Sequence, residues 1–172
     1  MSYAPVIPMS GVAGWRFLER TQAKQQAAFE NDAALRREIA YFEENIASVT
    51  TAADLVADRR LLKVALSAFG LGALIRKVLG KVPPAEGALA TRLTDPAWRK
   101  LSAAFGFGDA GARTGAAGFA GEIVSAYKTR AFEVAVGETD DNMRLAMNFR
   151  REIAALAAGD GGSWYSILRS KP

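Results

Sequence analysis

The sequence predicts an all-α fold, a single-domain multi-helical array of about seven to nine helices with no sheet. Three observations support this class. Apolar residues recur at spacings of three and four along several stretches. No stretch shows the alternation of apolar and polar residues that marks a strand. Gly, Pro, Asp and Thr stand where the helical stretches begin and end.

The N-terminal part is expected to hold an arm and two helices. Two prolines within residues 1–13 predict an extended, mobile arm ahead of one helical domain over 14–172. The first helix is expected over 14–29, and because its middle is weakly apolar it either lies on the body of the protein or serves a partner. A second helix starts at Asn31 or Asp32. Its apolar face is formed by Leu35, Ile39, Phe42 and Ile46.

Two short helices are expected at the centre of the array, flanked by the longer ones. They occupy 58–72 and 95–108, and both close on Ala-Phe-Gly-(Leu/Phe)-Gly. Asp58 can cap the first of them, Gly70 can end it in a left-handed turn, and Phe69 is expected to anchor it. This stretch is apolar over most of its circumference, which predicts burial on several sides.

The remaining helices are expected in the second half of the chain and just before it. They span 74–79, 86–93, 119–136 and 140–158. Gly137 is expected to break the chain between the two long ones. Across that break Arg144 is expected to pair with Glu133 or Glu138.

Composition limits the chemistry that the chain can perform. It has no Cys, hence neither disulfides nor thiolate metal sites, and no His, hence no imidazole base or ligand. We therefore predict that the protein is not an enzyme and uses no cofactor, no metal and no small-molecule substrate. Catalysis by Asp, Glu, Lys, Ser or Tyr ranks last among the alternatives.

The sequence offers no signal for a membrane span or for cleavable export. No apolar run approaches the roughly 18 residues that a membrane span needs. The N-terminus has neither a basic region nor a long apolar region, so it is not a cleavable secretory signal. The protein is therefore expected to be made in the cytoplasm.

Two kinds of residue are candidates for binding. A basic edge is expected from the densest positive cluster, Arg59, Arg60, Lys63, Arg76, Lys77 and Lys81. Nucleic-acid binding by that edge is a less favoured alternative, because the net charge is only +4 and the surrounding stretch is too apolar to lie in a groove. Contact with a protein partner is expected from aromatic residues near the chain ends, Trp15, Phe17, Trp164 and Tyr165.

The glycine-rich stretches at 106–108 and 111–118 invite comparison with a phosphate-binding loop. They lack the Gly-Lys-Ser/Thr ending of such a loop, and no strand precedes them. We interpret them as helix ends and a flexible loop.

Several motifs resemble one bacterial family. They are Gly14-Trp15-Arg16-Phe17-Leu18, Tyr41-Phe42, the run Thr51–Leu71, Leu93-Thr-Asp-Pro, Ala104-Phe-Gly-Phe-Gly, Tyr127, Phe132-Glu133, Gly137-Glu138, Arg144-Leu-Ala and Ser163-Trp164-Tyr165. Together they are similar to the uncharacterised bacterial family filed as domain of unknown function 1217. The resemblance covers nearly the whole chain, and the stretch from Asp58 is its most specific part.

The resemblance implies an all-α fold, no established enzymatic activity and no catalytic residues to carry over. It also implies an association with flagellar gene clusters, and hence protein–protein contact in flagellar assembly or motility. The alternative is a cytoplasmic regulator or chaperone-like binder of flagellar components. The implied location is cytoplasmic, or exported by the flagellar secretion apparatus without a cleaved signal. Relatives are expected to continue past the final Ser-Lys-Pro, which leaves a truncation at the C-terminus open.

Overall fold

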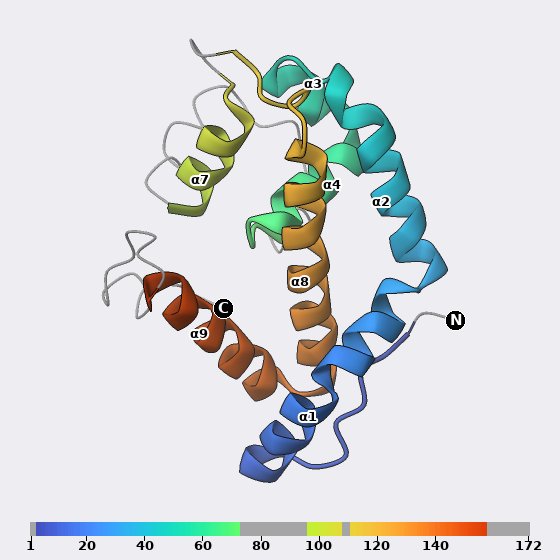
Figure 1. Cartoon of the computed structure of the whole chain (residues 1–172), viewed down its shortest axis with the longest axis vertical. Coiled ribbons are helices and arrows are strands. Elements are labelled where there is room, and N and C mark those ends of the chain that lie inside the picture. Colours follow the sequence, from blue (N-terminus) through green and yellow to red (C-terminus); the bar gives the residue numbers. More distant parts are fainter. Residues whose placement is uncertain (1–2, 73–95, 108–110, 158–172) are drawn as a thin grey trace. The chain divides into compact units, whose positions relative to one another are not determined.

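The computed structural model describes residues 3–72, 96–107 and 111–157, and within them every regular element is helical (Figure 1). The helices are α1 (Gly11–Glu30), α2 (Ala33–Asn45), the 3₁₀ helix η1 (Ile46–Ser48), α3 (Ala52–Ala57), α4 (Arg59–Ala68), α7 (Pro96–Phe105), α8 (Phe119–Thr139) and α9 (Asp141–Ala157). The all-α prediction is confirmed. The helices predicted over 74–79 and 86–93 lie outside the described residues.

The chain folds as two compact units. One, called here the α4 unit, is Asn31–Ala131; the other, the α1 unit, combines the described residues of Met1–Glu30 and Phe132–Pro172. Helix α8 contributes its first part to the α4 unit and its last part to the α1 unit. The predicted boundaries, an arm over 1–13 and one domain over 14–172, stay predictions.

Helix α4 is the centre of its unit because both of its ends are set locally and its middle is apolar. The Asp58 side chain accepts hydrogen bonds from the backbone N–H groups of Arg60 (2.8 Å) and Leu61 (3.1 Å), which caps the helix. At the other end Gly70 adopts φ 77°, and the N–H of Leu71 donates to the carbonyl of Leu66 (2.8 Å). The N–H of Gly70 also donates to the carbonyl of Ser67 (3.0 Å). These two hydrogen bonds define a Schellman ending, in which glycine is favoured.

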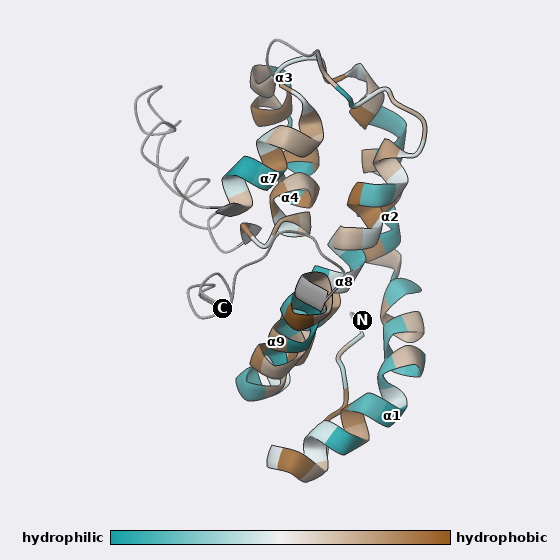
Figure 2. Ribbon diagram, turned by 60° about the vertical axis from the view of Figure 1, so that its left-hand side comes forward, coloured by the Kyte–Doolittle hydropathy of each residue, from teal (hydrophilic) through white to brown (hydrophobic). Residues whose placement is uncertain are grey.

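The apolar face of α4 is buried against neighbouring helices, and α2 lies beside it (Figure 1). Six of its ten residues are buried: Leu61, Leu62, Val64, Ala65, Leu66 and Ala68. The prediction that this helix is buried on several sides is therefore correct. Figure 2 shows the same element as mainly hydrophobic in its middle.

A cluster of phenylalanine rings forms a second part of the core of the α4 unit. Phe105, at the end of α7, is fully buried, and its ring meets the edge of Phe119 with the centroids 5.0 Å apart. Phe69 lies 6.4 Å from Phe105 between centroids but is itself only half-buried. The predicted anchor, Phe69, is therefore less deeply buried than Phe105. The loop before α8 is held by Thr114, whose hydroxyl donates to the carbonyl of Val49 (2.5 Å).

The α1 unit packs around Leu18, which is fully buried, and around an edge-to-face pair of Phe29 and Phe132 with ring centroids 5.7 Å apart. Helix α1 begins at Gly11, three residues earlier than predicted. The chain before it passes close to Gly14, where a Cβ would lie 1.9 Å from the carbonyl oxygen of Met9. Gly14 is therefore needed for the close approach of the arm to α1.

The expected break at Gly137 was wrong, because α8 continues through it to Thr139. A Cβ at Gly137 would lie 2.5 Å from Cδ of Arg144, so this glycine makes room for a side chain of α9. The predicted partner of Arg144 was also wrong. Arg144 pairs with Asp141 in its own helix (2.7 Å), whereas the buried Glu133 is held by Arg151 (2.9 Å). A helix places residues three apart on one face, which favours the local pair.

Candidate protein-interaction surface

Helix α1 has one buried face and one exposed face. Leu18, Gln25 and Phe29 are buried in the unit. Three cations, Arg16, Arg20 and Lys24, are exposed and follow one another at intervals of four residues. That spacing places them along one side of the helix, and we call them the cationic stripe. Figure 2 shows hydrophilic and hydrophobic residues mixed along this helix.

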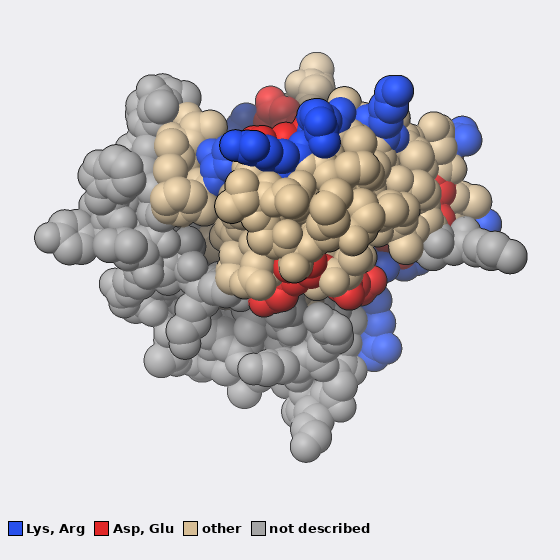
Figure 3. Space-filling model, turned by 90° about the horizontal axis from the view of Figure 1, so that it is seen from below, with Lys and Arg blue, Asp and Glu red and all other residues tan. Residues whose placement is uncertain are grey.

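No side chain of the cationic stripe has an ion pair or hydrogen bond with the residues that the structure describes. Like charges four residues apart repel each other by a few tenths of a kcal/mol per pair, so the stripe weakens the helix that carries it. Glu19 does not offset it directly, because it is paired with Arg150 of α9 (3.5 Å). In the view from below, Lys and Arg side chains gather along one edge of the described surface with Asp or Glu side chains among them, and further acidic side chains lie at the opposite edge (Figure 3).

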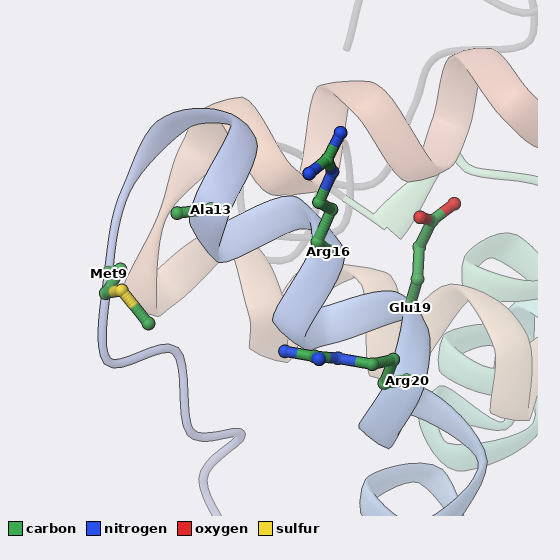
Figure 4. Close-up of a pocket in the computed structure, with 5 residues that line it drawn as sticks. All are labelled: Met9, Ala13, Arg16, Glu19 and Arg20. Atoms are coloured by element: carbon green, nitrogen blue, oxygen red, sulfur yellow. The ribbon is translucent and has the colours of Figure 1, made fainter.

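An open pocket lies at the N-terminal end of the stripe (Figure 4). Its volume is ≈ 550 Å³. It is lined by Met9, Ala13, Arg16, Glu19 and Arg20. The Arg20 side chain extends back along α1 toward the end that carries Ala13 and Met9. The pocket thus combines small or apolar groups with two cations of the stripe.

The same end of α1 exposes apolar side chains. Val12 is 71% exposed and Met9 is 51% exposed. Val12 lies four residues before Arg16 in α1, and Met9 lies seven residues before Arg16 in the segment that precedes the helix. Neighbouring exposed apolar groups beside polar ones are typical of a surface that contacts a partner.

The two aromatic residues predicted as partner contacts on this helix are partly accessible, and their role in partner contact stays a prediction. Trp15 is half-buried, and the guanidinium of Arg150 lies 5.2 Å from its ring centroid. Phe17 is half-buried as well. Sequence reasoning chose these aromatics and missed the cationic stripe, although the interval of four between its members would have revealed it. Trp164 and Tyr165 lie outside the described residues.

The predicted basic edge is placed in part. Arg59, Arg60 and Lys63 are exposed on α4, whereas Arg76, Lys77 and Lys81 lie outside the described residues. Two of the three placed cations are engaged within the α4 unit. The guanidinium of Arg60 stacks 3.6 Å from the ring centroid of Tyr41, and Lys63 forms an ion pair with Glu38. This edge is therefore less available to an anionic ligand than the cationic stripe.

Two tyrosines of the α4 unit donate hydrogen bonds to carboxylates. Tyr41 donates to Asp58 (2.6 Å), and this hydrogen bond is the main reason that the pKa of Tyr41 is raised. Burial acts to raise the pKa of Asp58, but the hydrogen bonds from Tyr41 and from the capped backbone outweigh it, so that this pKa is lowered. Tyr127 donates to Glu38, and burial together with that bond raises its pKa.

The described residues show no group of three or more carboxylates, His or Cys that could hold a metal ion. The expectations of no metal and no cofactor stay expectations. Among the helices that could be searched, none has both the length and the apolar character for crossing a membrane.

Comparison with known proteins identifies the family of the chain. A family model described as "Protein of unknown function (DUF1217)" matches residues 72–172, more than half of the chain. The fold is similar to a crystal structure of a protein from Agrobacterium tumefaciens, with a TM-score of 0.65 and 26% sequence identity; the similarity covers 87% of this chain and 70% of that one. No curated protein is significantly similar to the chain.

Proposed function

This chain belongs to the DUF1217 family of proteins of unknown function, and from that premise we propose that it acts without catalysis, by protein–protein contact. The contact surface is the exposed side of α1. The observation that carries the proposal is the cationic stripe, whose three charges have no partner among the described residues. The exposed apolar side chains of Met9 and Val12 lie beside its N-terminal end.

A role in contact rather than catalysis is supported by the chemistry of the pocket. Glu19 is the only carboxylate among the described residues that line it, and it forms an exposed ion pair with Arg150 (3.5 Å), so the pocket lacks a second carboxylate for acid–base work. Its other polar groups are the guanidinium groups of Arg16 and Arg20, which stay protonated in proteins and do not take up protons. With no His or Cys in the chain, the groups most often used for proton transfer and nucleophilic attack are missing.

The setting that we propose is the flagellar system, in assembly or motility. The family resemblance, with its association with flagellar gene clusters, supports this setting. A cytoplasmic regulator or chaperone-like binder of flagellar components is the second candidate. Both roles use the same surface, and they differ in location and in their effect on flagellar gene expression.

Site-specific photo-crosslinking in native cells tests the contact surface. A photoreactive residue at Val12 is expected to capture a defined partner protein. The matched control is Ala154, an exposed residue of α9. Equal capture from both positions, or none from Val12, would contradict the proposal.

The flagellar setting is tested by deleting the gene. Loss of motility with normal expression of flagellar genes supports assembly or motility, and altered expression supports the regulator. Normal motility together with normal expression would remove the flagellar setting.

A further inference from the structure

We infer that the partner of α1 presents an acidic helix, whose carboxylates repeat every four residues and whose end carries an apolar side chain that enters the pocket beside Met9 and Ala13. This inference rests on the proposed function and names the chemistry of the partner. It is argued from the spacing of the cationic stripe, from the residues between its members and from the pocket at its end.

The spacing of the stripe suits a second helix. A helix rises about 1.5 Å per residue, so cations four residues apart are about 6 Å apart along the axis, and the whole stripe spans about 12 Å. A partner helix with Glu or Asp at the same interval places one carboxylate opposite each cation. Two of the three cations are Arg, and a guanidinium can hold a carboxylate through two parallel hydrogen bonds.

The surface between the cations allows close approach. At 100° per residue, Arg16, Arg20 and Lys24 span a sector of 80°, and Ala13 and Ala27, both exposed, fall within that sector. Two residues lie 20° outside it, the exposed Ala23 on one side and the half-buried Phe17 on the other, so the groups between the cations are methyl groups and the nearest bulky group, Phe17, stands at one edge. Long Arg and Lys side chains can then reach carboxylates from either side.

An acidic partner also removes a cost that the free protein carries. The three cations repel one another along the helix. Carboxylates opposite them turn this repulsion into attraction. The energy gained per exposed pair is modest, so the apolar contact at Met9 and Val12 is needed to give the complex its position and part of its affinity.

Other anionic surfaces fit less well. A helix that lies on a membrane buries a continuous apolar face in the lipid, but the apolar face of α1 is already buried around Leu18 and Phe29. The large apolar side chains exposed beside the stripe, Met9 and Val12, stand at one end of α1 and do not form a continuous face along it. Duplex DNA is read by amide and basic side chains in a groove, and the sector of α1 that carries the stripe has its three cations and alanines but no amide side chain.

The test is a binding titration of the full chain with labelled peptides, followed by fluorescence anisotropy. The probe is a helical peptide with Glu at three successive positions four residues apart and Leu at one end. The reference peptide has the same composition, with its Glu residues distributed around the helix. The protein is expected to bind the probe several-fold more tightly than the reference, with an affinity that falls as salt rises.

The decisive variants reverse equal amounts of charge at two places. The triple variant Arg16→Glu, Arg20→Glu, Lys24→Glu changes the cationic stripe. The matched control Arg36→Glu, Arg37→Glu, Arg59→Glu changes exposed cations of the α4 unit. The stripe variant is expected to bind about tenfold more weakly, the equivalent of three exposed ion pairs, whereas the control stays within about twofold of the parent.

Folding of both variants is checked by circular dichroism. Where reversal of the stripe unfolds α1, the milder triple change to Gln serves in its place and is expected to weaken probe binding in the same direction. Equal weakening by stripe and control variants would overturn the inference, since it would mean that only net charge matters. Equal binding of probe and reference peptides would do the same.

Tighter, stripe-dependent binding to vesicles of anionic phospholipid or to duplex DNA than to the probe would replace the acidic helix by those ligands and also overturn the inference. Failure here is distinguishable from failure of the proposed function. A partner captured at Val12 whose capture is unaffected by salt or by the stripe variant leaves the contact function standing and removes its acidic chemistry. If the protein binds the probe peptide but no partner is captured at Val12 in cells, the affinity of the stripe for an acidic helix stands and the proposed contact function is contradicted.

Discussion

Gln25 holds both backbone polar groups of one residue in the arm: its Oε1 accepts a hydrogen bond from the N–H of Val6 (2.7 Å), and its Nε2 donates to the carbonyl of Val6 (3.0 Å). Gln25 is buried, and Nε2 also donates to the hydroxyl of Thr21 (2.9 Å). The arm has a further contact in Thr139, which donates to the carbonyl of Pro5 (3.3 Å). The segment beside Met9 is therefore positioned by specific bonds.

Replacing Gln25 by Ala is expected to release the arm. Two hydrogen bonds to Val6 are lost, each with a net value of about 1 kcal/mol, so the unfolding free energy should fall by about 1–2 kcal/mol. Hydrogen exchange at the Val6 amide should become faster. The control is Gln26→Ala, because Gln26 bonds only Glu30 in its own helix (3.0 Å) among the contacts described for its side chain. Unchanged protection of Val6 would show that the arm is held by other contacts.

Arg151 and Arg144 are expected to differ in their importance for stability. Arg151→Ala leaves the buried Glu133 without its guanidinium, which should cost about 3 kcal/mol. Arg144→Ala removes an ion pair to the exposed Asp141 and should cost less than about 1 kcal/mol. Urea denaturation of the two variants compares them directly. A larger loss for Arg144→Ala would mean that its packing over Gly137 outweighs the buried ion pair.

Phe105 is expected to matter more than Phe69. Phe105→Ala removes a fully buried ring and should lower the unfolding free energy by about 3–5 kcal/mol. Phe69→Ala removes a half-buried ring, so about half of that loss is expected. Thermal and chemical denaturation measure both values. Equal losses would restore Phe69 as the anchor of the α4 unit.

Asp58 gives the protein a dependence on acid pH. Its pKa is lowered in the folded state, so its contribution to stability is present above the pKa of the unfolded chain, about 3.9, and is lost as the pH falls through the folded value. The difference in unfolding free energy between the parent and Asp58→Asn should therefore be largest near neutral pH and shrink below about pH 4. Because Asp58 is partly exposed to solvent, a modest difference is expected. A difference that does not change between pH 6 and pH 3 would contradict the lowered pKa.

The ionisation of Tyr41, which donates a hydrogen bond to Asp58, provides a second test at high pH. The pKa of Tyr41 is raised by its hydrogen bond to Asp58, so the stability that this bond gives is complete below the ordinary tyrosine pKa of about 10 and is lost as the pH rises through the folded value. In Asp58→Asn the absorbance change of Tyr41 ionisation should move to lower pH. Tyr41→Phe identifies the signal, and an unmoved signal would mean that the bond does not persist in solution.

Local sequence signals determined the parts of this protein whose bonds lie within a few residues of one another. Asp58 caps α4 and Gly70 ends it, because a cap and a Schellman turn need only neighbouring backbone groups. The all-α class follows from the same kind of information, since the three-and-four spacing of apolar residues creates a face to be buried. The family model bears out the family resemblance over residues 72–172, whereas the stretch from Asp58 to Leu71, expected to be its most specific part, lies outside that match.

Only the tertiary structure decided which residues meet across the chain. Gly137 was expected to end a helix, but its missing side chain makes room for Arg144 and the helix continues. The partner of Glu133 proved to be Arg151, eighteen residues away, and Phe105 proved to be more deeply buried than the expected anchor, Phe69. The cationic stripe shows the same limit. The sequence contains its spacing, but only packing buries Leu18 on the opposite side of α1. The same packing leaves Arg16, Arg20 and Lys24 exposed and without partners among the described residues. Distant contacts and exposure depend on how the helices pack, and helical spacing alone does not specify that packing.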